Sequence, residues 1–265
     1  MTTQELLLSA WDWEPSVVVG CAALVAGYIA LRGFRSAGLQ ACVSFLGGTL
    51  LLLLALVSPI DTLGDTYLFS AHVVQHFLLA LVIPPLWLLG TPRAFAESSM
   101  RIAWIGRTEY ALAQPFVAWP LGVGCMLVWH LPPLFNAALA HDALHIFQHL
   151  SFLVTGVIFW WPILSPITEK RLMVLHATAY LFSACVCCSL LGAVLTFMPS
   201  GAYPAYLNPD DRLGILRLVR VDWGLDPETD QQLGGLLMWV PGCLVYLSGI
   251  LGAAARWYAA AETEA

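Results

Sequence analysis

Seven long apolar segments dominate this chain and limit what it can fold into. Hydrophobic residues make up 59% of its 265 positions and charged residues only 11%, which excludes an ordinary soluble domain and a disordered chain. A helix needs roughly 20 mostly apolar residues to cross a bilayer. We therefore expect one all-α domain over residues 1–265, a polytopic membrane protein built as a seven-transmembrane-helix bundle. The expected helices cover about 15–33, 37–58, 67–90, 115–134, 143–164, 171–198 and 231–256.

The rest of the chain argues against several other classes of protein. The connections are short and polar, apart from 199–230, and show no repeat or low-complexity linker. A net charge of −6 without basic runs argues against a nucleic-acid partner. We expect no cleavable signal peptide, because the acidic, amphipathic N-terminus lacks the positive stretch that one needs. Most of the seven cysteines lie inside apolar runs, unlike the disulfide framework of a secreted domain.

The basic residues predict how the chain is oriented. If the N-terminus faces outside, the cytoplasmic segments carry eight of the eleven Lys and Arg residues and the outer segments carry three. Cytoplasmic loops of membrane proteins are enriched in these residues, so we expect the N-terminus outside and the C-terminus in the cytoplasm. The eight are Arg32, Arg35, Arg93, Arg101, Arg107, Lys170, Arg171 and Arg256, and the three are Arg212, Arg217 and Arg220.

Six of the seven histidines then lie toward the outer side, in three short clusters. His72 and His76 on the third expected helix, and His145 and His149 on the fifth, are four residues apart, which puts both imidazoles of each pair on one helix face. Imidazole is the commonest metal ligand, and ionisable side chains inside a bilayer indicate function because they are costly there. These four are our leading candidate ligands of a metal or cofactor site. For any single one, a hydrogen bond between helices is the alternative.

Several neighbouring side chains could complete such a site. His130 ends the fourth expected helix, where it is either a direct ligand or an interfacial histidine beside Trp129. Gln75 and Gln148 could fix imidazole tautomers or simply join two helices. Asp61, at the outer end of the second helix, could bind the metal or orient an imidazole.

Four further polar residues are expected to lie outside the site. Asp226 and Asp230 flank the start of the seventh expected helix and suit N-terminal capping. His141 is expected in solvent before the fifth helix. His176 lies near the cytoplasmic start of the sixth helix, away from the other histidines.

Sulfur ligands would favour Cu(I). Met126 and Met238 lie in the outer halves of the fourth and seventh helices and are possible accessory ligands. Cys185, Cys187 and Cys188 lie near the middle of the sixth helix, where cysteine also serves as an ordinary small apolar residue. Cys185 and Cys188 have the spacing of a Cys-x-x-Cys redox motif, but the βαβ pattern that accompanies such a motif is missing from the sequence around them.

Longer motifs between residues 58 and 242 make the chain resemble one known family. They are Ser-Pro-Ile-Asp at 58–61, Ser-Ala-His-Val-Val-Gln-His at 70–76, Pro-Pro-Leu-Trp-Leu-Leu-Gly at 84–90, Trp-His-Leu-Pro-Pro-Leu-Phe at 129–135, His-Ile-Phe-Gln-His-Leu-Ser-Phe at 145–152, Phe-Trp-Trp-Pro at 159–162 and Asp-Gln-Gln-Leu-Gly-Gly-Leu-Leu-Met-Trp-Val-Pro-Gly at 230–242. Each motif alone is weak evidence for a family, but the seven motifs together are specific. They resemble the CtaG family of bacterial cytochrome c oxidase assembly factors, the polytopic seven-helix kind.

The resemblance implies a multi-pass protein of the bacterial inner membrane that matures heme–copper terminal oxidases. Its motif positions include His72, His76, His130, His145 and His149, whereas the cysteine run is not part of the pattern. We therefore expect a non-enzymatic assembly factor that holds copper and passes it to the oxidase. The implied partners are membrane lipid, an immature oxidase subunit and a periplasmic copper donor.

Three alternatives remain open. A seven-helix zinc hydrolase would use Ser70 and Asp61 beside the histidines, with zinc activating water. A heme-binding protein would use one histidine from each of the two pairs. A scaffold would use the histidines only to bridge helices.

Overall fold

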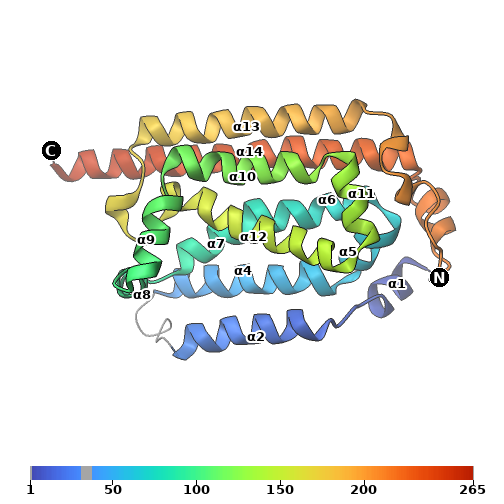
Figure 1. Cartoon of the computed structure of the whole chain (residues 1–265), viewed down its shortest axis with the longest axis horizontal. Coiled ribbons are helices and arrows are strands. Elements are labelled where there is room, and N and C mark those ends of the chain that lie inside the picture. Colours follow the sequence, from blue (N-terminus) through green and yellow to red (C-terminus); the bar gives the residue numbers. More distant parts are fainter. Residues whose placement is uncertain (1, 31–37, 265) are drawn as a thin grey trace.

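The computed structural model describes residues 2–30 and 38–264, and within these residues every regular element is a helix. The helices run side by side in an elongated bundle (Figure 1). Five of them are long and apolar enough to cross a membrane, and the bent pair α9–α10 would make a sixth crossing. The chain is thus an all-helical membrane protein. The five are α4 (Leu39–Val57), the continuous run α6–α7 (Phe69–Gly90), α12 (Asp142–Leu164), α13 (Val174–Phe197) and α14 (Pro227–Glu264).

The first expected helix is shorter than the others in the described residues. Helix α2 covers Pro15–Ala30, 16 residues, which corresponds to about 24 Å of helix. Residues 31–33 of that expected helix, residue 37 of the next one, and the expected cytoplasmic Arg32 and Arg35 lie outside the described residues.

The third long helix contains a wide turn where two prolines follow. α6 (Phe69–Phe77) passes through a π-helical turn (η2, Leu78–Val82) into α7 (Ile83–Gly90). Pro84 cannot donate a backbone hydrogen bond, and its ring clashes with the carbonyl four residues earlier in a regular helix. A π-helical turn ahead of it lets the helix continue.

The prediction that the fourth helix covers 115–134 was wrong at its C-terminal end. α10 ends at Trp129 (Pro115–Trp129), and α11 (Pro132–Ala140) is a separate short helix. A residue before proline avoids the helical conformation, and Leu131 is accordingly extended (φ −66°, ψ 126°). The same effect at Gln114, before Pro115, accompanies the 76° bend between α9 (Ala103–Leu112) and α10.

The connections hold more helix than the sequence suggested. The expected short polar connection after the third helix contains α8 (Arg93–Met100) and α9, and the N-terminus forms α1 (Thr3–Ser9) with a capping box at Thr2. The remaining short elements are α5 (Pro59–Thr62), η1 (Leu63–Tyr67), η3 (Thr168–Lys170), η4 (Ser200–Ala202), η5 (Pro204–Tyr206) and η6 (Leu218–Asp222).

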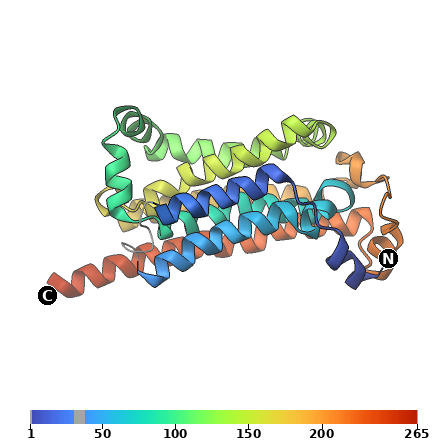
Figure 2. The same cartoon turned by 90° about the horizontal axis from the view of Figure 1, so that it is seen from below.

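The two ends of the bundle differ. One end, here called the α1 end, carries α1, α5, α11 and the segment 198–226. The other, here called the α8 end, carries α8, α9 and the C-terminus (Figures 1 and 2). In the interior, α13 and α14 pack closely because Gly192 faces Gly235, where an added Cβ would lie 2.8 Å from the Gly235 carbonyl oxygen. Small residues of this kind commonly join membrane helices.

Candidate metal centre

The start of α6 is held by a carboxylate from another helix. Asp230, in the first turn of α14, accepts hydrogen bonds from the Phe69 and Ser70 N–H groups (2.7 and 3.1 Å) and from the Ser70 hydroxyl (2.5 Å). A carboxylate there satisfies unpaired N–H groups and interacts favourably with the helix dipole. The expected capping role therefore holds, but the helix that Asp230 caps is α6 rather than its own. Asp226 does cap α14, accepting two of its first N–H groups at 3.0 Å each.

Four imidazoles meet near this start, two from α6 and two from α12. The ring centroids of His72 and His76 are 4.3 Å apart, and those of His145 and His149 are 4.2 Å apart. Between the helices, His72 lies 5.2 Å from His145 and 5.8 Å from His149, measured between centroids. The corresponding distance from His76 to His149 is 5.6 Å. The structure therefore brings together the two pairs that lie on separate helices in the sequence.

His130 joins the same group from the end of α10. Its ring is buried, and its centroid lies 5.3 Å from that of His76. Its Nδ1 donates a 2.7 Å hydrogen bond to the Met126 carbonyl, one turn earlier on α10. That bond leaves Nε2 as the nitrogen with a free lone pair, because a neutral imidazole carries one donor and one acceptor nitrogen.

Six imidazole nitrogens in this group are buried without a hydrogen-bond partner among the described residues. An unpaired buried polar atom costs about 1–3 kcal/mol, and such atoms are few in folded proteins. Their concentration in one place is explained if a metal ion supplies the missing partner. The atoms are His72 Nε2, His76 Nδ1, His76 Nε2, His130 Nε2, His145 Nε2 and His149 Nε2.

Among the described residues, two sets of three side chains are close enough to bind one ion. In the inner set, one nitrogen each from His72, His76 and His149 lie within 4.8 Å of one another. In the outer set, the same limit holds for Asp65, His72 and His145. Tetrahedral coordination with bonds of 2.0–2.1 Å places ligand atoms about 3.3 Å apart, so either set needs only small side-chain movements. Three imidazoles suit copper or zinc.

Asp65 is a site residue that the sequence analysis missed. It is half-exposed, and its Oδ1 lies 3.6 Å from His145 Nε2 and 3.9 Å from His72 Nδ1. Partial burial raises the pKa of the Asp65 carboxyl, and the negative charge of Asp61 raises it further. The only signal in the sequence is its spacing: residues 65, 72 and 76 would share one face of an uninterrupted helix.

Asp61 and Gln75 bind each other rather than the imidazoles. The Gln75 side-chain amide donates to Asp61 Oδ1 (2.7 Å) and to the Ala55 carbonyl (3.0 Å). Burial raises the pKa of Asp61 to about 7, and the hydrogen bond from Gln75 opposes this rise. The pair ties α6 to the end of α4. Gln148 is fully buried, and neither polar atom of its amide has a hydrogen-bond partner among the described residues.

A glycine and two tyrosines brace the outer side of the group. The Gly64 carbonyl accepts a hydrogen bond from the Tyr206 hydroxyl (2.7 Å) and lies 3.3 Å from His72 Nδ1. The Tyr203 hydroxyl donates to the His130 carbonyl (2.7 Å). Gly64 cannot carry a side chain here, because an added Cβ would lie 2.6 Å from Gln75 Oε1. The segment 198–226 therefore fixes the backbone beside two of the histidines, which no local sequence pattern indicates.

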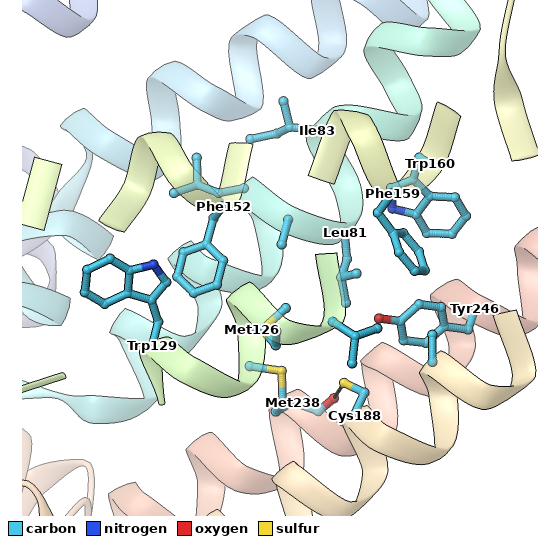
Figure 3. Packing of buried hydrophobic residues seen from close by; sticks show 14 of the residues in the cluster. Leu81, Ile83, Met126, Trp129, Phe152, Phe159, Trp160, Cys188, Met238 and Tyr246 are labelled. Atoms are coloured by element: carbon cyan, nitrogen blue, oxygen red, sulfur yellow. Dashed lines mark hydrogen bonds between the residues drawn. The ribbon is translucent and has the colours of Figure 1, made fainter. Parts of the chain in front are cut away.

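The sulfur side chains lie deeper in the bundle. Met126 and Met238 are buried in the hydrophobic core together with Cys188, as Figure 3 shows. Cys188 Sγ donates to the Met238 carbonyl (3.4 Å), and Cys185 Sγ lies 3.1 Å from Cys243 Sγ. These cysteine sulfurs thus have partners, in contrast to the imidazole nitrogens. Cys187 is partly buried beside them.

The two remaining histidines lie outside the group, as expected. His141 is exposed and forms the N-cap of α12. His176 is exposed in the first turn of α13, at the α8 end.

Comparison with known proteins gives one family and several uncharacterised relatives. A family model described as cytochrome c oxidase caa3 assembly factor (Caa3_CtaG) matches residues 22–260. An uncharacterized protein of Mycobacterium leprae is 26% identical over 268 residues, which cover 92% of this chain and 39% of the relative. Uncharacterized proteins of Mycobacterium bovis and Mycobacterium tuberculosis are each 25% identical over 274 residues, 95% of this chain and 40% of theirs. The chain thus spans about 40% of the length of these curated relatives. No solved structure matches it.

Proposed function

The chain belongs to the cytochrome c oxidase caa3 assembly factor family, and from this premise we propose that it binds copper at the histidine group and delivers it to the immature oxidase. Copper here is cargo rather than a resident cofactor, and no covalent chemistry is involved. The observation that carries the proposal is the inner set of His72, His76 and His149, whose ligand nitrogens lie within 4.8 Å of one another. The Nε2 atom of each has no hydrogen-bond partner among the described residues.

Delivery requires that the ion can leave. A structural site closes all four coordination positions with protein ligands, whereas a site that exchanges its ion keeps one open. The inner set supplies three imidazoles and leaves the fourth position for an incoming ligand of the oxidase subunit. His130 Nε2, next to His76, is placed to take over a bond during that exchange.

The proposal includes a topology with seven crossings in the bacterial inner membrane. Helix α2 and the bent pair α9–α10 would add two crossings to the five long helices. Of the basic residues within the described ranges, six lie toward the α8 end and three in the segment 198–226 at the α1 end. By the positive-inside rule, the α1 end and the N-terminus face the periplasm and the C-terminus faces the cytoplasm. Reporter fusions after Arg107 and Asp222 should then report cytoplasm and periplasm; the same compartment for both would contradict seven crossings.

This sidedness would place the histidine group toward the periplasm. A periplasmic copper donor could then load it, and the oxidase subunit could receive the ion within the same leaflet. Because the copper donor and the oxidase subunit would both reach the site from the same side, the protein would not have to move the ion across the membrane.

The zinc hydrolase is the runner-up and is less well supported. That mechanism would need Ser70 and Asp61 to face the metal. The Ser70 hydroxyl instead donates to Asp230, and Asp61 accepts a hydrogen bond from Gln75. Heme is disfavoured for a different reason: Phe135 and Phe152 pack against His72 and His76 with centroids 4.8 and 4.3 Å apart. This close packing opposes a planar macrocycle between α6 and α12.

The test is the copper content of the oxidase. A strain lacking this protein would be complemented with the wild type, His76→Ala or His176→Ala, and the oxidase purified from each. We expect His76→Ala to resemble the deletion, with heme inserted but little copper per heme. His176→Ala is the matched control, because the same substitution falls on an exposed residue at the other end, and it should restore copper. A normal copper-to-heme ratio with lost activity would reject copper delivery, and a normal oxidase in the deletion strain would reject the assembly role.

A further inference from the structure

We propose that the outer set, Asp65 with His72 and His145, is a second metal position through which the ion enters and leaves the inner set. The inference rests on the proposed function, because it concerns the path of the same ion. The two sets share His72, so the two positions are adjacent. An ion moving inward exchanges Asp65 and His145 for His76 and His149.

Exposure decreases along this path. The Asp65 side chain is 37% exposed and that of His145 15%, whereas His72 and His76 are fully buried. His149, the third residue of the inner set, is partly exposed, but its Nε2 atom is buried. An ion that arrives from water meets Asp65 and His145 first.

The ligand chemistry also differs between the positions. Asp65 contributes a carboxylate oxygen, a hard ligand, while imidazoles suit copper and zinc. Further acids lie at the same end, among them Asp142, which begins α12 one turn before His145. A local excess of negative charge raises the concentration and arrival rate of cations. The transfer is ligand exchange alone, without a change of oxidation state.

The spacing within the outer set is compatible with a shared metal ion. Asp65 Oδ1 is 3.6 Å from His145 Nε2 and 3.9 Å from His72 Nδ1, which is too long for a hydrogen bond. The Asp65–His145 separation is close to the distance of about 3.3 Å between two ligands of one tetrahedral ion. His72 would bind through Nε2, because its Nδ1 lies beside the Gly64 carbonyl. In addition, His145 Nε2 has no hydrogen-bond partner among the described residues.

The test compares the rates of copper uptake and release with the equilibrium dissociation constant for copper, using the purified protein in detergent. Cu(I) would be loaded anaerobically, and its uptake and its release to a colorimetric chelator followed for the wild type and Asp65→Asn. If Asp65 serves the path, Asp65→Asn should slow uptake and release at least tenfold and leave the dissociation constant within about threefold, because the inner set determines affinity. Asp65→Glu should restore much of both rates. Asp142→Asn, which removes a nearby charge but no proposed ligand, should keep wild-type release.

Other outcomes overturn the inference in distinct ways. Wild-type uptake and release rates in Asp65→Asn would show that no ion passes Asp65. A weaker affinity with unchanged uptake would make Asp65 a ligand of the resting site instead. Both results leave copper binding by the inner set intact, whereas a wild-type protein that binds no Cu(I) would overturn the proposed function and this inference together.

Discussion

Histidine and cysteine, two common transition-metal ligands, occupy different regions of this bundle. At the α1 end, five histidines from α6, α10 and α12 surround a small volume in which six of their nitrogens have no hydrogen-bond partner in the described chain. In the seam between α13 and α14, the Cys185 and Cys243 sulfurs contact each other and Ser189, and Cys188 donates to a backbone carbonyl.

The difference teaches that residue type alone does not identify a metal site. Both regions are buried and both contain several potential ligands. Thiols tolerate burial as small apolar side chains, so the cysteine seam is satisfied without a metal. Imidazole nitrogens are not, because a buried polar atom without a partner destabilises the fold. This difference is why we propose metal binding for the histidine region alone.

The largest expected effect comes from His76→Ala. His76 is fully buried, and neither of its ring nitrogens has a hydrogen-bond partner in the described parts of the chain. Loss even of a residue that only supports a ligand typically weakens metal binding 10–100-fold, so loss of a ligand should weaken copper binding at least about 100-fold. The copper-dependent rise in melting temperature should disappear as well, because a ligand stabilises only the state that binds it. Titration with a competing chelator measures the affinity, and retained wild-type affinity would place the site elsewhere.

Two glycine substitutions, one in each region, test whether copper affinity depends on the histidine region or only on the stability of the whole protein. Gly64→Ala would put a Cβ 2.6 Å from Gln75 Oε1 at the histidine region, and Gly192→Ala would put one 2.7 Å from Trp239 Cβ in the α13–α14 seam. Each should destabilise the protein by about 1–3 kcal/mol through overpacking. Only Gly64→Ala should also weaken copper binding, because Gly64 braces His72. Equal loss of affinity in both variants would mean that copper binding simply follows global stability.

Asp61 makes the histidine region sensitive to pH in a way that the cysteine seam is not. Because burial raises its pKa to about 7, its protonated form is favoured in the folded state. Its contribution to stability is fully present below the ordinary pKa of 3.8 and is lost progressively as the pH rises from there through about 7. Asp61→Asn should therefore stabilise the protein by about 1 kcal/mol more at pH 8 than at pH 6. Thermal melting of metal-free protein at both pH values measures this, and equal effects at both would contradict a raised pKa.

The smallest expected effect on copper belongs to the cysteine seam. The double variant Cys185→Ala/Cys243→Ala removes a contact between two sulfurs and leaves small gaps, so we expect a loss of about 1 kcal/mol in stability. Copper affinity should stay within about twofold, because neither sulfur belongs to the proposed site. A tenfold loss of copper affinity, equal to 1.4 kcal/mol, would indicate that a cysteine of the seam binds the metal.

The apolar segments predicted most of the helices, and the spacing of the histidines predicted which side chains meet. Apolar length identifies α4, α12 and α13 to within a few residues because a membrane helix requires it. The prolines at 115 and 132 explain why the chain bends before α10 and why α10 ends at Trp129. The direction that the chain takes after each proline depends on packing. The π-helical turn at Leu78–Val82 likewise precedes a proline, Pro84, but the sequence alone does not show that the helix continues through it.

The parts of the site that the sequence did not predict come from residues far apart in the chain. Asp230 caps a helix that begins 161 residues earlier, at Phe69. Tyr206 reaches Gly64 across 142 residues. Asp65 meets His145 only because η1 and the start of α12 lie at the same end of the bundle. Local periodicity carries no information about such contacts, since they depend on how the helices are arranged.

X-ray absorption at the copper edge of the loaded protein tests the central assignment most directly. The account predicts only nitrogen and oxygen scatterers at about 2.0 Å, with the pattern of several imidazole rings, and the loss of at least one ring in His76→Ala. A sulfur scatterer at about 2.3 Å, the length of a metal–thiolate bond, would contradict it and assign the ion to the cysteine seam.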